Sequence, residues 1–193
     1  MPRWKPDTRQ RLVMAALQLF AEKGYDATTV SEVAERAGLT RSTFHRHFGD
    51  KRDVLTAGQE TLSRLLSEGI AAAPADATPM TALAAGLEHA SAGMTAFNRE
   101  VGPLMHAAIE ANDELRRRST AKRAGLAAAI TEALTRRGTS LATAQVAAEL
   151  GVLAFHLGFS RWTDPSRDEN PGELAPLALA ALDELHAAAR RLR

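Results

Sequence analysis

The sequence predicts an all-α protein, with a small helix-turn-helix domain ahead of a longer helical bundle. Alanine, leucine, glutamate and arginine dominate its 193 residues, and runs of β-branched residues are absent. Glycine or proline interrupts the apolar periodicity at helical intervals. We therefore expect a three-helix domain at residues 1–53 and a helical bundle domain at residues 54–193.

The first helix is expected to follow Asp7 and to end at Gly24. Asp7 with Gln10 three positions later is a capping pattern, and glycine is the usual residue just past a helix end. The apolar residues between these two signals share one helical face. They are Leu12, Val13, Ala16, Leu19 and Phe20.

Two short helices follow, separated by a tight turn. Thr29 with Glu32 forms a capping box for the first of them, and Gly38 supplies the turn. Thr40 can cap the second, which is expected to end near Phe48. Two short helices joined at a glycine turn are the geometry of a helix-turn-helix.

Further helices, all long except a short one over residues 103–111, account for the rest of the chain. They are expected over residues 50–70, which links the two domains, and over 81–97, 103–111, 113–137, 140–162 and 172–191, with loops over 71–79 and 163–171. The segment Val146–Phe159 is apolar nearly all round, and residues 174–188 carry a second apolar stripe. This is more apolar surface than a small monomer buries, so it predicts a homodimer, with a monomer core as the alternative.

The second short helix carries the residues that favour DNA. Phe44 and Phe48 are four positions apart and define its inward face, so small hydroxyls, an arginine and two imidazoles point elsewhere. Such a surface suits a major groove, where Arg46 can bond guanine and the other groups can reach phosphates. Lys51, at the expected start of the long linking helix, is predicted to contact a phosphate.

The segment TVSEVAERAGLTRSTFHRHFGDK, from Thr29 to Lys51, resembles the DNA-binding signature of TetR-family regulators, as does LFAEKGY at 19–25. The resemblance covers about Thr8 to Leu55 and departs at His45, where the family usually has tyrosine. It implies a cytoplasmic, ligand-released repressor that binds a pseudopalindromic double-stranded operator as a homodimer. The expected DNA contacts are Thr29, Arg41, Ser42, Thr43, His45, Arg46, His47 and Lys51.

The resemblance also implies that the second domain both dimerises and binds a small effector. The candidate wall residues, each of which can equally be ordinary core, are Leu87, Met94, Phe97, Met105, His106, Ile109 and Phe155. Beyond residue 53 there are only four aromatic residues, too few for an aromatic cage around a quaternary cation. A largely aliphatic, neutral ligand is therefore favoured.

Composition argues against several other kinds of protein. The chain has no cysteine, which excludes disulfides and cysteine-based zinc sites. We find no run near the roughly 18 apolar residues of a membrane helix, so no membrane partner is expected. A purely architectural DNA-binding protein would carry a larger basic surplus than the ten Lys and Arg against seven Asp and Glu of residues 1–53. An activator of the same fold stays open, because the sign of regulation depends on where the operator lies.

No signature of an enzyme is present. We find no nucleophile with its base, carboxylate pair, metal triad or phosphate-binding glycine loop, so no catalytic residue and no cofactor are expected. His45 and His47 lie about 200° apart on a helix and cannot share a metal ion, while His106 and Glu110 lack a third ligand. The basic residues Arg116–Arg118, Lys122 and Arg123 are interpreted as a solvated helix face.

Overall fold

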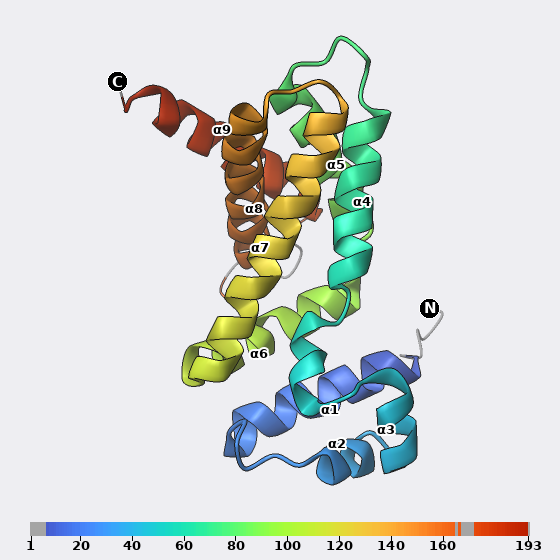
Figure 1. Cartoon of the computed structure of the whole chain (residues 1–193). Coiled ribbons are helices and arrows are strands. Elements are labelled where there is room, and N and C mark those ends of the chain that lie inside the picture. Colours follow the sequence, from blue (N-terminus) through green and yellow to red (C-terminus); the bar gives the residue numbers. More distant parts are fainter. Residues whose placement is uncertain (1–6, 165, 167–171, 193) are drawn as a thin grey trace. The chain divides into compact units, whose positions relative to one another are not determined.

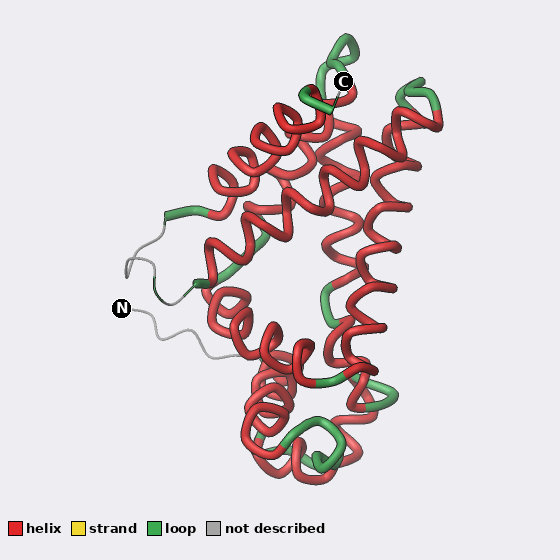
Figure 2. The backbone as a smooth tube through the Cα atoms, turned by 90° about the vertical axis from the view of Figure 1, so that its left-hand side faces the viewer, coloured by secondary structure: helices red, strands yellow, loops and turns green. Residues whose placement is uncertain are grey.

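The computed structural model describes residues 7–164, 166 and 172–192, and all regular structure in these ranges is helical (Figures 1 and 2). The predicted all-α fold class is thereby confirmed. In chain order the elements are α1 (Thr8–Lys23), α2 (Val30–Arg36), α3 (Arg41–His47), the 3₁₀ helix η1 (Lys51–Thr56), α4 (Gln59–Ala72), α5 (Pro79–Ala92), α6 (Ala96–Ala111), α7 (Asp113–Arg136), α8 (Leu141–Thr163) and α9 (Leu174–Arg190).

The chain divides into two compact units. The head unit comprises Met1–Ala57 and Ala96–Thr120, and the body unit comprises Gly58–Thr95 and Ala121–Arg193. One of the boundaries, after Thr120, falls inside α7, which continues as a single helix to Arg136. The division into domains at residues 53 and 54 stays a prediction.

The head unit has its own apolar core. Leu12 and Leu17 of α1 and Phe44 of α3 are fully buried in it. Residues from much later in the chain belong to the same core, including Phe97 and Val101 of α6 and Leu115 of α7. Helix α6 and the start of α7 are therefore parts of the head unit.

The body unit is built from closely packed helices. A methyl group added at Gly86 of α5 would lie 2.9 Å from the backbone oxygen of Leu66 in α4, and one at Gly158 of α8 would lie 2.6 Å from the Cα of Ala178 in α9. Glycine at these positions lets the helix pairs approach closely, as van der Waals packing requires. Buried leucine, isoleucine and alanine side chains fill the space between the helices.

Three predicted helix boundaries are wrong. The long linking helix over 50–70 is interrupted, because η1 ends at Thr56 and Gly58 has a positive φ of 81° before α4 begins. Helix α5 ends at Ala92, and a separate helix, α6, begins at Ala96. Pro103, which suggested a helix start, lies inside α6. The loop over 71–79 is confirmed, whereas Pro165 and Pro171 of the other predicted loop lie outside the described residues.

Helix α8 carries more apolar surface than the body unit buries. Val146 is 63% exposed and Leu153 is 42% exposed, and Leu141 at the start of the helix is exposed as well. By length and composition alone, α8 is the one helix among the described residues that could cross a membrane, a criterion that core helices of soluble proteins also meet. The opposite side of α8 packs against α9 and α5, as a core helix does.

Candidate nucleic-acid interface

Local capping builds the helix-turn-helix as the sequence predicts. The side chain of Thr29 accepts a hydrogen bond from the backbone N–H of Glu32, which caps Thr29 in return. Thr40 caps α3 through the N–H of Thr43. Between the two helices, Gly38 has a φ of 65°, a conformation that glycine adopts without strain. Arg11 of α1 donates to the carbonyl of Ala37 and supports this turn.

Ion pairs fix α2 against α1. The two terminal nitrogens of Arg36 donate to the two carboxylate oxygens of Glu22, each at 2.7 Å. Lys23 donates to Glu32. The hydrogen bond from Lys23, together with those from Thr29, lowers the pKa of Glu32 to about 2. These contacts orient α2, the first helix of the motif.

The exposed face of α3 carries the hydroxyl, arginine and imidazole groups that the sequence predicts there. Phe44 and Phe48 are buried, which confirms the predicted inward face. None of the seven residues of α3 is acidic. The exposed side chains of the helix are Arg41, Ser42, His45, Arg46 and His47.

Several of these polar groups already interact with one another. Arg46 Nη2 donates to Thr43 Oγ1 at 3.1 Å, and Thr43, which is half-buried, also lies 3.0 Å from the hydroxyl of Thr40. Arg41 Nε donates to His45 Nε2 at 3.5 Å. The His45 ring packs edge-on against Phe44, with 5.6 Å between centroids. The arginines are thus held along the helix, which limits the conformational freedom they lose on contacting a ligand.

Lys51 lies in a different environment from the one predicted. It begins a six-residue 3₁₀ helix rather than a long α-helix, and its backbone N–H already donates to the carboxylate of Asp50. Its ammonium donates to the carbonyls of Tyr25 at 2.7 Å, Thr28 at 2.8 Å and Asp26 at 3.3 Å. The same ammonium lies 4.3 Å from the centroid of the Tyr25 ring. The side chain of Lys51 therefore holds the turn between α1 and α2.

The candidate effector-binding residues are distributed between the two units. Leu87, Met94 and Phe155 pack in the body-unit core. The head-unit core contains Phe97, Met105 and Ile109. His106 is exposed on α6 and pairs with Glu110 at 3.3 Å.

Sequence reasoning did not find a shallow depression on the body unit. Arg123 of α7 lies on its edge, with its Nη2 2.7 Å from Nε2 of His156 in α8. The depression has a volume of about 500 Å³ and is lined by Arg123, Gln145, Val146, Glu149, Leu150, Val152, Leu153 and His156. The exposed apolar face of α8 is the one sequence signal that pointed toward it.

The interpretation of the basic run on α7 as a solvated face is wrong in part. Arg118 is half-buried and contacts both Glu114 of α7 and Asp53 of η1. Glu114 and Arg118 have the spacing of a helical ion pair, so their contact could have been predicted. The contact with Asp53 spans 65 positions of sequence and gave no local signal.

The comparisons with known proteins agree with this geometry. Residues 12–57 match the family model described as bacterial regulatory proteins of the tetR family. Over 76 residues, 39% of this chain, the sequence is 38% identical to the HTH-type transcriptional regulator BetI of Rhizobium meliloti (strain 1021). The chain thus spans 37% of the length of that curated relative.

Two solved structures share the fold over nearly the whole chain. A transcriptional regulator from Aquifex aeolicus VF5 has a TM-score of 0.56 at 21% identity, over 94% of this chain and 99% of that one. Thermus thermophilus FadR, a TetR-family transcriptional repressor in complex with lauroyl-CoA, has a TM-score of 0.51 at 24% identity, over 92% and 93% of the two chains. Residues 12–57 thus carry the helix-turn-helix of the TetR family of bacterial regulatory proteins, and nearly the whole chain shares the fold of the two solved regulators.

Proposed function

We propose that the protein is a cytoplasmic transcriptional repressor that binds a double-stranded operator as a homodimer and is released by a small hydrophobic effector. The observation that carries DNA binding is the exposed face of α3. It presents two arginines and two histidines with no acidic residue, on a helix anchored by two buried phenylalanines. A short helix with this surface fits the major groove of DNA.

Within this surface we assign base recognition to Arg46. An arginine on the outer face of a recognition helix can donate two hydrogen bonds to one guanine. Thr29, Arg41, Ser42, Thr43, His45 and His47 are assigned to the sugar-phosphate backbone or to adjacent base edges. Lys51 is assigned to holding the α1–α2 turn, because its ammonium already has three carbonyl partners.

The exposed apolar face of α8 supports the homodimer. Val146 and Leu153 would be covered by a second copy of the chain, in keeping with the excess of apolar surface that the sequence predicts. Two helix-turn-helix units are also what a pseudopalindromic operator requires.

The effector and the sign of regulation rest on similarity. FadR of Thermus thermophilus is a repressor in complex with lauroyl-CoA, which contains a long aliphatic chain. A largely aliphatic ligand also suits a chain with few aromatic residues beyond its head unit. Of the predicted wall residues, Leu87, Met94 and Phe155 share the body-unit core, and we propose that the effector binds against these three.

Selection of bound fragments from genomic DNA tests the proposal. We expect enrichment of a pseudopalindromic site, followed by a loss of about 1–3 kcal/mol in binding to that site when Arg46 is replaced by alanine. Binding of Arg46→Ala to random DNA should change much less. Failure of the wild type to enrich any sequence would refute specific DNA binding, and an equal loss on both DNAs would refute the role of Arg46.

A further inference from the structure

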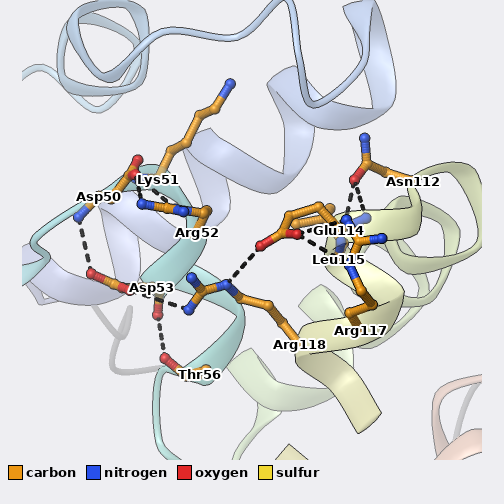
Figure 3. Close-up of polar contacts among 10 residues, drawn as sticks. All are labelled: Asp50, Lys51, Arg52, Asp53, Thr56, Asn112, Glu114, Leu115, Arg117 and Arg118. Atoms are coloured by element: carbon orange, nitrogen blue, oxygen red, sulfur yellow. Dashed lines mark hydrogen bonds and ion pairs between the residues drawn. The ribbon is translucent and has the colours of Figure 1, made fainter. Parts of the chain in front are cut away.

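The start of α7 contacts the chain on both sides of the helix-turn-helix. One contact is made by Asn112, whose side-chain oxygen caps α7 by accepting from the N–H groups of Glu114 at 3.0 Å and Leu115 at 3.2 Å (Figure 3). The nitrogen of the same amide donates to the carboxylate of Asp26 at 3.3 Å. Asp26 lies in the turn that leads into α2.

The other contact is made by Arg118, two turns further along α7. Its Nε lies 3.3 Å from Glu114 Oε1, and its Nη1 lies 3.9 Å from Asp53 Oδ1 (Figure 3). Asp53 belongs to η1, which follows α3, and its other carboxylate oxygen accepts from the N–H of Asp50 at 3.0 Å. Arg118 therefore contacts η1, the helix that follows α3 in the chain.

These contacts form a closed set with Lys51. Lys51 joins η1 to the α1–α2 turn, Asn112 joins that turn to α7, and Arg118 joins α7 back to η1. Helices α2 and α3 lie between the two tied segments in sequence. Because each segment is bonded to the other two, a movement of one changes the geometry of all three.

We propose that the first two turns of α7 hold the helix-turn-helix in position, with Arg118 as a positioning residue for DNA binding. The proposal rests on the proposed function of α3. It assigns a role to a residue that is 65 positions from its partner Asp53 and lies outside the helix-turn-helix.

The chain offers a matched control in the neighbouring arginine. Arg117 also pairs with Glu114, at 2.9 Å, and within the described part of the chain it makes no hydrogen bond or ion pair with η1. Arg118→Met and Arg117→Met remove the same charge from adjacent positions, so long-range attraction to DNA falls about equally in both. Arg118 is also the more buried of the two, so the contact with Asp53 is reported by a difference between them that disappears when Asp53 is replaced as well.

We would measure the affinity of the full-length variants for the DNA fragment selected above. An ion pair with side chains 32% and 39% exposed is weak, so Arg118→Met should bind about two- to fivefold more weakly than Arg117→Met. Arg118→Lys, which keeps the charge, should recover most of that loss. Asp53→Asn keeps an oxygen that can accept from the N–H of Asp50. Added to Arg118→Met, it should weaken DNA binding little further.

Thermal unfolding of each variant shows whether folding is intact. Equal DNA affinity for Arg117→Met and Arg118→Met would overturn the proposal, as would additive effects of Arg118→Met and Asp53→Asn. Failure of the wild type to bind any selected fragment would instead refute the proposed function. The two failures are therefore distinguishable.

Discussion

Replacement of Lys51 by methionine should destabilise the protein and leave the salt dependence of DNA binding unchanged. Its ammonium donates to three backbone carbonyls at 2.7, 2.8 and 3.3 Å and packs on the Tyr25 ring. Methionine retains the length of the side chain but offers no donor, so these carbonyls lose their partner. Water can reach part of this half-exposed site and replace some of the lost bonds.

The magnitude follows from the kind of bond. A hydrogen bond to a charged group contributes about 1.5–3 kcal/mol, and water replaces part of the three, so we expect a total loss of about 2–3 kcal/mol. For a chain of 193 residues this lowers the Tm by about 4–12 °C. Arg52→Met is the matched control, because Arg52 is exposed and its ion pair, at 2.8 Å, is with Asp50, the N-cap of η1. Its Tm should change by about 2 °C or less.

Two measurements decide the role of Lys51. Differential scanning calorimetry gives the Tm, and operator affinity across a salt series gives the slope of log K against log salt. If Lys51 contacts a phosphate, its replacement should make that slope less steep by about 0.9 for each head unit. If Lys51→Met keeps the wild-type Tm but shows this less steep salt dependence, the structural role of Lys51 is refuted. The phosphate contact predicted from the sequence would then be supported.

Two further predictions concern the head unit and the oligomer. The pKa of Glu32 is about 2 rather than 4.5 because of Lys23 and Thr29, so the stability it contributes is complete above pH 4.5 and is lost as the pH falls toward 2. The Tm difference between wild type and Glu32→Gln should therefore be largest above pH 4.5 and should shrink as the pH approaches 2. A difference that does not depend on pH would contradict this. For the oligomer, sedimentation should show a dimer at micromolar concentration that Leu153→Glu converts to monomer. Leu157 is less suitable, because it packs against the body-unit core.

Sequence patterns predicted those features of the head unit that depend on neighbouring residues. The caps at Asp7, Thr29 and Thr40 and the inward face of Phe44 and Phe48 all involve partners within four positions. At such separations the helix itself brings the partners together, so the spacing alone specifies the contact. The exposed residues of α3 follow from the same helical geometry.

Contacts between distant segments left no comparable signal. Lys51 reaches carbonyls 23 to 26 positions away, and any residue type could supply those backbone oxygens. The membership of α6 in the head unit likewise depends on side chains such as Phe97 and Val101. Their spacing indicates that they are buried, but it does not indicate which helices they pack against. The predicted effector pocket drew on both units for this reason.

The interrupted linking helix gives a test in which the two interpretations differ in sign. In a continuous helix over 50–70, Gly58→Ala would raise stability by up to about 1 kcal/mol, because alanine is the better helix former. In the structure Gly58 has a φ of 81° and a ψ of −1°, where a side chain costs about 1–2 kcal/mol, partly offset by the stiffer unfolded chain. A methyl group there would meet no atom within 4 Å, so this cost comes from the backbone alone. We therefore expect Gly58→Ala to lower the Tm by about 2–4 °C and Gly58→Asn, which tolerates this conformation better, to lower it less. A higher Tm for Gly58→Ala would mean that residues 50–70 form one helix after all.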